Sequence, residues 1–336
     1  MTAESRNGLV AAAPVLEVRD LCTHFRTEDG VVKAVDGVSF ELRRGEVLGI
    51  VGESGCGKSA TGLSIMRLVP GEIASHPRGQ VLYGGKDLLR ASDDELRSIR
   101  GNRISMIFQD PLTSLNPYMT VGRQLTEVLE LHRALDRRAA CVRAREMLER
   151  VGIAEAERRM AAYPHELSGG MRQRVMIAMA LLCEPDVLIA DEPTTALDVT
   201  IQAQILLLIQ RLQRDSGTSV ILVTHDLGVV AGMADRVLVM YAGRVVEGAS
   251  TDALFRARAH PYTAGLLAGI PRLDARNGAP LRAIPGLPPD LLHTPSGCPF
   301  RPRCPRALEL CAHEYPGRTE LGEGHYAHCH NREPAP

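Results

Sequence analysis

Up to about residue 250, short apolar runs alternate along the chain with longer amphipathic stretches. Short apolar runs predict buried strands and amphipathic stretches predict helices, so their alternation is typical of an α/β domain. Ser92 and Glu95 have the spacing of a capping box for a helix that begins at Asp93. The strands expected are Val15–Val18, Val35–Leu42, Val47–Val51, Arg103–Phe108, Val187–Asp191, Ser219–Thr224 and Val237–Tyr241. The helices expected begin after Lys58 or span Asp93–Arg100, Val121–Val151, Gly170–Leu182 and Ile201–Asp215.

The composition changes near residue 256, and 13 of the 21 prolines follow that point. Because proline lacks an amide hydrogen and clashes with the preceding turn, no long helix is expected there. Such a stretch is either a disordered tail or a small domain held together by something other than a hydrophobic core. Four cysteines favour the small domain, so we divide the chain into residues 1–255 and 256–336. These cysteines are Cys298, Cys304, Cys311 and Cys329.

The charge and apolar content are those of an ordinary globular protein, with a net charge of −1 and 45% hydrophobic residues. This charge gives no strong attraction to nucleic acid or anionic lipid. The longest apolar run, Val175 to Cys183, is far shorter than the ~20 residues that cross a bilayer. Residues 1–14 lack the apolar block of a secretory signal. We therefore expect a cytoplasmic protein with reduced thiols, whose clustered cysteines indicate a metal before disulfides.

Residues 52–59 read Gly-Glu-Ser-Gly-Cys-Gly-Lys-Ser and match the phosphate-binding loop pattern directly after an expected strand. Glycines let backbone N–H groups turn toward phosphates, Lys58 adds positive charge, and Ser59 can ligate Mg²⁺. The alternative is a glycine-rich turn with an incidental lysine. Cys56 is either a reactive thiol, favoured by Lys58 and the helix start, or a small filler. The expected phosphate contacts are Gly52, Glu53, Ser54, Gly55, Cys56, Gly57, Lys58, Ser59 and Ala60.

The second motif is a pair of acidic residues, Asp191 and Glu192, which follows the apolar run Val187-Leu-Ile-Ala. An aspartate at such a strand end can hold the shell of a Mg²⁺ ion, and the next carboxylate can deprotonate an attacking water. Many buried strands end in aspartate for turn reasons alone. Beside a phosphate-binding loop, the pair predicts nucleotide hydrolysis.

Residues 167–173, Leu-Ser-Gly-Gly-Met-Arg-Gln, resemble the signature motif of the ABC ATPase family. The resemblance implies that Ser168, Gly169 and Gly170 bind the phosphate of ATP held by an opposite subunit, since a helix start favours anions. It also implies a fold with an α/β ATPase core, an antiparallel β subdomain and a helical signature subdomain. Four further residues match the family pattern, and each also has a plain structural alternative. Phe25 could be a core side chain, Gln109 a loop amide, Asp198 a helix cap and His225 a strand-end histidine. The family roles fall on Phe25 (adenine stacking), Gln109 (Q-loop, catalysis and Mg²⁺), Ala196-Leu197-Asp198 (D-loop) and His225 (switch histidine).

The resemblance narrows to ATP-binding subunits of bacterial oligopeptide and dipeptide importers, over about residues 15–329. It is carried by the runs 108–117, 191–202, 260–263, 284–289 and 298–305. In that subfamily the ATPase pairs with a second, similar ATPase, two integral membrane permease subunits and an extracytoplasmic peptide-binding protein. In that subfamily the tail of one ATPase holds a [4Fe-4S] cluster, and many relatives carry serine at the position of Cys56. The resemblance further implies that residues 110–121 lie near the membrane subunits.

The cysteine spacing alone leaves open which metal the tail binds, and whether it binds one at all. The intervals in Cys298-x₅-Cys304-x₆-Cys311-x₁₇-Cys329 contain no close pair of the kind zinc fingers prefer, and four thiolates suit either Zn²⁺ or an iron–sulfur cluster. Nearby histidines at 313, 325, 328 and 330 complicate the ligand count. The resemblance favours the cluster.

Rival functions are an ABC protein acting on DNA or ribosomes and the motor of an exporter. No sustained heptads separate Ser59 from Ser168, only one ATPase half is present, and no membrane span is fused to it. These features favour an importer subunit at the cytoplasmic face of the membrane, without nucleic acid partners. The cargo stays open among dipeptides, oligopeptides, nickel and glutathione, and the second ATPase is either a homologue or another copy.

Overall fold

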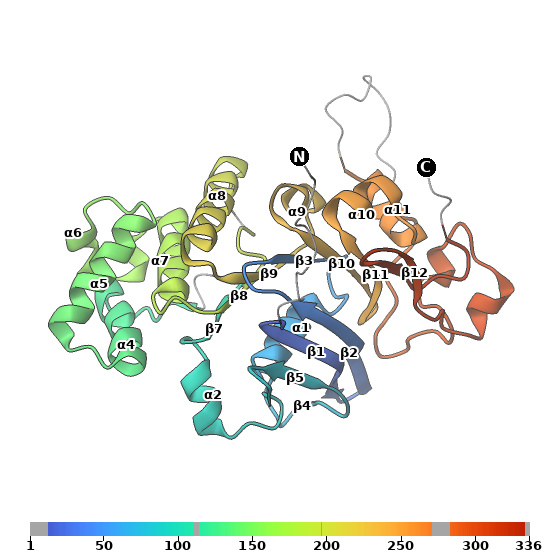
Figure 1. Ribbon diagram of the computed structural model, residues 1–336, viewed down its shortest axis with the longest axis horizontal. Helices are drawn as coiled ribbons and strands as arrows, with labels where there is room; N and C mark the ends of the chain where they lie inside the picture. The colour runs from blue at the N-terminus through green and yellow to red at the C-terminus, as the bar shows by residue number, and fades with distance from the viewer. Residues whose placement is uncertain (1–12, 111–113, 196, 271–282, 333–336) are drawn as a thin grey trace, which may run out of the picture.

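The computed structural model describes residues 13–110, 114–195, 197–270 and 283–332 (Figure 1). Its main sheet has the order β12-β13-β11-β10-β3-β9-β8-β7. Strands β7 to β10 along that order pair in parallel, and β11, β13 and β12 add to it antiparallel. The strands are β3 (Val47–Val51), β7 (Ile104–Ile107), β8 (Val187–Asp191), β9 (Ser219–Thr224), β10 (Arg236–Tyr241), β11 (Arg244–Ser250), β12 (Thr319–Gly322) and β13 (His325–Ala327). The expected strands Val47–Val51, Val187–Asp191 and Ser219–Thr224 are confirmed residue for residue.

A second, antiparallel sheet lies beside the first, with the order β2-β1-β5-β6 and β4 paired to β1 (Figure 1). Helix α1 (Lys58–Ile65) contacts β1, β2 and β8, so it packs between the two sheets. Apolar side chains from both sheets form one buried cluster there. The strands are β1 (Leu16–Thr27), β2 (Gly30–Leu42), β4 (Ala74–Ser75), β5 (Gln80–Tyr83) and β6 (Lys86–Asp87), and β1 and β2 run further than their apolar residues indicated.

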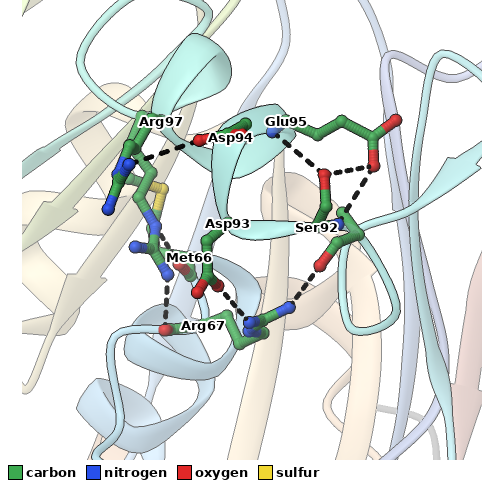
Figure 2. A network of polar contacts seen from close by, with 9 residues as sticks. Met66, Arg67, Ser92, Asp93, Asp94, Glu95 and Arg97 are labelled. Atoms are coloured by element: carbon green, nitrogen blue, oxygen red, sulfur yellow. Dashed lines mark hydrogen bonds and ion pairs between the residues drawn. The ribbon is translucent and has the colours of Figure 1, made fainter.

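Helix α2 (Asp93–Ile99) has the expected capping box (Figure 2). The Glu95 amide donates to Ser92 Oγ over 3.3 Å, and the Ser92 amide donates to Glu95 Oε2 over 3.0 Å. Two otherwise unpaired helix donors are thereby satisfied. Arg67 ties the same turn to the end of α1 through Asp93 Oδ1 at 2.7 Å and the Ala91 carbonyl.

The helical region consists of α4 (Val121–Arg133), α5 (Arg137–Arg150), α6 (Ala156–Met160) and α7 (Gly169–Leu181), grouped at one end of the molecule (Figure 1). The prediction of a single helix over Val121–Val151 is wrong, because the structure has two helices there, α4 and α5. Ala134 takes a left-handed φ of 49° and ends α4. Asp136 then caps α5, its side chain accepting from the Ala139 amide at 2.8 Å. The sequence has no glycine or proline at this break that would have indicated the end of a helix.

The C-terminal residues join the main sheet, because β13 pairs with β11 and β12 pairs with β13. Glu247 on β11 is fully buried beneath them and accepts hydrogen bonds from His325 Nε2 (2.9 Å) and from the backbone amides of Ala259 and His260 (2.7 and 2.9 Å). Burial raises the pKa of Glu247, but these hydrogen bonds outweigh it and the pKa is lowered. The remaining elements are α8 (Val199–Ser216), α9 (Leu227–Met233), α10 (Thr251–Ala257), α11 (Pro261–Ala268) and the 3₁₀ turns Pro164–Glu166, Arg301–Arg303 and Glu309–Ala312.

As expected, only short helices follow residue 256 in the described part of the chain. None of the helices described anywhere in the chain is long and apolar enough to cross a membrane.

Candidate functional site

The glycine-rich loop leaves β3 and wraps back onto β10 and β2 before α1 begins. Gly52 and Gly57 have φ angles of 154° and 104°, which residues with side chains rarely adopt. A Cβ on Gly52 would lie 2.3 Å from the Met240 carbonyl oxygen, and one on Gly57 2.1 Å from that of Ala34. Only glycine fits these two positions, so the loop backbone is held close against its neighbours.

Lys58 is the first residue of α1 and its side chain is buried in this loop. Its Nζ donates to the carbonyl oxygens of Gly52 at 2.8 Å and Glu53 at 2.9 Å. It also lies 3.9 Å from Cys56 Sγ. A buried ammonium group whose contacts here are two carbonyls and a thiol attracts anions, because none of these three partners is a carboxylate. Of the other expected phosphate contacts, Ser54 and Gly55 are exposed and Ala60 is half-buried on α1.

Ser59 and Asp191 meet across the end of the main sheet, where Ser59 Oγ donates to Asp191 Oδ1 over 2.9 Å. Burial raises the pKa of the Asp191 carboxyl, and the Glu192 carboxylate raises it further against the opposing effect of Ser59. A desolvated carboxylate beside a hydroxyl is the hard-oxygen donor set that Mg²⁺ prefers. The two residues therefore fit the expected Mg²⁺ site.

Residues from three separate segments converge at Glu192. Its carboxylate accepts from Gln109 Nε2 at 3.1 Å and from Thr195 Oγ1 at 2.9 Å, and His225 Nδ1 lies 3.3 Å away. Gln109 follows β7, Glu192 follows β8 and His225 follows β9, and the carboxyl ends of parallel strands share one edge of the sheet. The three expected catalytic side chains are therefore adjacent. The sequence analysis did not include Thr195 in the site. Its position three residues after Glu192 could have suggested it, because that spacing lets the hydroxyl reach the Glu192 carboxylate.

The backbone of Glu192 takes a left-handed φ of 44°. For a residue with a side chain this costs about 1–2 kcal/mol, and the Glu192 amide donates to the Val223 carbonyl at 2.9 Å in that conformation. Such strain persists only where surrounding contacts maintain it, and it is common at functional sites.

The signature residues begin α7 at some distance from the phosphate loop in this chain (Figure 1). Ser168 is the N-cap, its Oγ accepting from the Met171 amide at 3.3 Å. Asp198 is likewise the N-cap of α8, accepting from the Ile201 amide at 3.0 Å. A Cβ on Gly170 would lie 3.2 Å from Ile201 Cγ2, so the two helix starts pack together. No hydrogen bond among the described residues joins Ser168–Gly170 to the phosphate loop.

Phe25 and Ala196 are the remaining expected residues. Phe25 is half-buried on β1, between Val32 of β2 and Ala74 of β4. Ala196 of the D-loop lies outside the described residues, as do residues 111–113 of the segment expected near the membrane subunits.

The expectation that the loop favours the Cys56 thiolate is wrong. Cys56 is 6% exposed, and burial raises the pKa of its thiol against the opposing charge of Lys58. Reactive cysteines have a lowered pKa, whereas cysteines buried in this way are inert. The alternative of a small apolar filler is the one that the structure favours.

None of the four tail cysteines forms a disulfide, and their thiols lie near enough to affect the pKa values of Cys298 and Cys329. The Cys298 amide donates to the Cys311 carbonyl at 2.9 Å. Burial raises the pKa of Cys298, and the thiols of Cys311 and Cys304 add to this. Burial also raises the pKa of Cys329 to about 11, with a contribution from each of the other three thiols. Within the described ranges, however, no group of three or more His, Cys, Asp or Glu side chains is placed to hold a metal ion, so the expected cluster is not shown.

Two family models match the chain. Residues 35–195 match a model described as ABC transporter, which covers the phosphate loop, the signature and Glu192. Residues 246–311 match one described as the C-terminal region of oligopeptide/dipeptide transporters, which covers three of the four tail cysteines.

Similar curated proteins extend over nearly the whole chain. The dipeptide transport ATP-binding protein DppD of Bacillus subtilis is 56% identical over 315 residues, which are 94% of this chain and 94% of that protein. The oligopeptide transport ATP-binding protein OppD of Salmonella typhimurium is 55% identical over 299 residues, or 88% of each chain.

Solved structures resemble the ATPase part. A dimeric ATP-binding cassette in a post-hydrolysis state, bound to ADP and Pi, has a TM-score of 0.63 and 29% identity, covering 70% of this chain and 98% of its own. The cbiO1 subunit of a Clostridium perfringens ABC transporter complex has a TM-score of 0.60 and 30% identity, covering 72% of this chain and 90% of its own. Given the identity and coverage of these relatives, the chain belongs to the family of ABC transporter ATP-binding subunits to which the dipeptide and oligopeptide ATP-binding proteins belong.

Proposed function

We propose that this chain hydrolyses ATP to power the uptake of dipeptides or oligopeptides through two membrane permease subunits, on the cytoplasmic face of the membrane. The observation that carries the catalytic part is the convergence of Gln109, Thr195 and His225 on Glu192, next to the Ser59–Asp191 pair. The peptide cargo is supported by the match of residues 246–311 and by the names of the relatives.

In this proposal the phosphate loop binds the ATP phosphates through its amides and through Lys58. Ser59 and Asp191 would hold Mg²⁺, assisted by Gln109, and the ion would neutralise phosphate charge when bound. Glu192 accepts the proton of the attacking water, while Gln109 and His225 hold its carboxylate in position. Phe25 would stack on the adenine.

The signature residues would act on a nucleotide bound by another subunit. Ser168, Gly169 and Gly170 present the amides and the positive dipole end of α7, which favour a phosphate. No described hydrogen bond joins them to the phosphate loop of their own chain. In a head-to-tail pair of ATPase subunits, they would instead face the nucleotide bound by the partner's phosphate loop. A dimeric ATP-binding cassette is among the similar structures. We propose a homologous second ATPase as the partner, with Asp198 near the shared interface.

For the tail we propose that residues 256–336 form a C-terminal domain packed against the ATPase core, and that Cys298, Cys304, Cys311 and Cys329 ligate a [4Fe-4S] cluster. The assignment is supported by four thiols that form no disulfide, since the thiols of Cys304 and Cys311 help to raise the pKa of both Cys298 and Cys329. Among the described residues, the positions of these side chains do not form a metal-binding group. We assign no catalytic step to the cluster.

The function is tested by isolating the complex in mild detergent and reconstituting it in vesicles. We expect two polytopic membrane proteins and a second ATPase to co-purify. Peptide-loaded binding protein should stimulate ATP hydrolysis, whereas the same protein loaded with nickel or glutathione should not. Co-purification with nucleic acid or ribosomes, or stimulation only by nickel or glutathione, would contradict the proposal.

A further inference from the structure

A partly buried ion pair joins the C-terminal tail to the phosphate loop, across 250 residues of sequence. Arg303 Nη1 lies 2.6 Å from Glu53 Oε2, and Arg303 Nη2 lies 2.9 Å from Glu53 Oε1. The Arg303 side chain is only 5% exposed. Glu53 is the residue directly after Gly52, inside the loop proposed to bind phosphates. A bidentate pair of this kind fixes orientation as well as distance.

The remaining donors of Arg303 are also occupied. Nε donates to the Pro285 carbonyl at 3.0 Å, Nη2 donates to that of Ile284 at 3.4 Å, and Nη1 donates to Tyr241 Oη at 3.4 Å. With the two bonds to Glu53, these contacts match the five N–H groups of a guanidinium. The side chain therefore has a single orientation, set by β10 and by tail residues, and lysine could not reproduce it.

Glu53 is held by its backbone as well as by its carboxylate. Its amide donates to Tyr262 Oη at 2.8 Å, and its carbonyl accepts from Lys58 Nζ at 2.9 Å. Tyr262 belongs to α11 and packs on Phe300, with the ring centroids 5.3 Å apart. Phe300 immediately precedes the 3₁₀ turn that carries Arg303. The first turn of the phosphate loop thus rests on residues that follow the ATPase core in the sequence.

We infer that Arg303 is a positioning residue of the ATP site: through Glu53 it holds the phosphate loop in its binding conformation and neutralises a carboxylate that would otherwise repel phosphate. The inference rests on the proposed role of the phosphate loop. Arg303 and its neighbours supply none of the groups that converge on Glu192, so the effect falls on nucleotide binding rather than on the hydrolytic step.

Equilibrium binding of a fluorescent ATP analogue to the full-length subunit, with steady-state hydrolysis by the assembled complex, tests this. Arg303→Ala should raise the Kd and the KM at least tenfold and change kcat less than about twofold. Arg303→Lys should fall between, because it keeps the charge without the bidentate geometry. Arg301→Ala is the matched control, since Arg301 is an exposed arginine of the same turn, and it should bind as the wild type does.

Glu53→Gln removes the charge from the other end of the pair. In the Arg303→Ala background it should restore part of the affinity, because the unpaired carboxylate is gone. Wild-type Kd in a folded Arg303→Ala variant, or a double variant that binds more weakly than Arg303→Ala alone, would overturn the inference. Lys58→Ala separates the two claims: if it too leaves binding unchanged, the proposed phosphate site itself is wrong.

Discussion

Glu192 combines a strained backbone with several side-chain contacts. Its backbone is strained at a φ of 44°, and its carboxylate is within reach of Gln109, Thr195 and His225. A glutamine at this position keeps the shape of the side chain but loses the negative charge, and with it the capacity to accept a proton from water. The residue therefore offers a direct test of the proposed base.

Glu192→Gln is expected to bind ATP normally and to hydrolyse it ~10²–10⁴-fold more slowly, the usual effect of losing a general base. Single-turnover phosphate release from the assembled complex measures the step. Because unhydrolysed ATP would continue to bridge the subunits, the variant should also accumulate as a closed ATPase pair in size-exclusion chromatography. Phosphate release at the wild-type rate would rule out Glu192 as the base.

At the scale of elements, the start of α7 is capped by Ser168 and packed against the start of α8. Ser168→Arg places a bulky side chain where the phosphate of the partner's nucleotide is proposed to bind. We expect turnover by the complex to be abolished while the isolated subunit keeps its own ATP affinity. Ser168→Thr, which preserves the cap, is the control and should remain active. An equal loss of ATP affinity in the isolated subunit would contradict action on the partner's nucleotide.

The start of α11 makes the stability of the C-terminal region depend on pH. His260 is fully buried, its Nδ1 accepts from the Tyr262 amide at 3.0 Å, and burial lowers its pKa to about 4. The unfolded histidine titrates near pH 6.5, so the unfolded state binds more protons below that value. The stability that neutral His260 provides is thus complete above pH 6.5 and decreases as the pH falls toward 4.

Thermal unfolding between pH 7.5 and 5 measures this dependence. Four other histidines, at positions 24, 76, 132 and 328, have pKa values lowered by burial and contribute in the same direction. The comparison with His260→Asn, which can still cap the helix, isolates one residue. The variant should lose less stability than the wild type over this range, and identical pH profiles would show that His260 does not contribute.

At the scale of the whole molecule, the tail is built into the ATPase core. Its strands β12 and β13 extend the main sheet, it covers Glu247, and Arg303 reaches Glu53. Apolar side chains of β10, β11, α10 and α11 pack with Phe300 and Cys298 in one cluster. The four thiols are thus held at the edge of a preformed scaffold, where bound metal would add folding free energy.

Protein purified without oxygen is expected to be brown and to contain about four irons per chain, as a [4Fe-4S] cluster requires. Cys304→Ser should lose the colour and the iron and should increase proteolysis of the tail. Cys141→Ser, which changes an exposed thiol on α5, should retain both. Stoichiometric zinc without iron would refute the cluster and leave a four-cysteine site.

Local patterns were sufficient wherever a single segment contains the physical cause. Strands β3, β8 and β9 are apolar runs with polar or glycine boundaries, and their ends were predicted to the residue. The capping box of α2 and the phosphate loop were predictable because their donors and acceptors lie within a few residues. The break between α4 and α5 was missed, since Ala134 carries no local signal for a left-handed backbone.

By itself, the sequence determined the phosphate loop, the acidic strand end, the signature helix and the family, because each is a contiguous motif. Only the tertiary structure decided that Thr195 and His225 meet at Glu192, that Cys56 is buried with a raised pKa, and that Arg303 pairs with Glu53. The physical reason is that burial and ion pairing depend on which distant segments exclude water from one another. That depends on how the whole chain packs, which no local pattern of residues specifies.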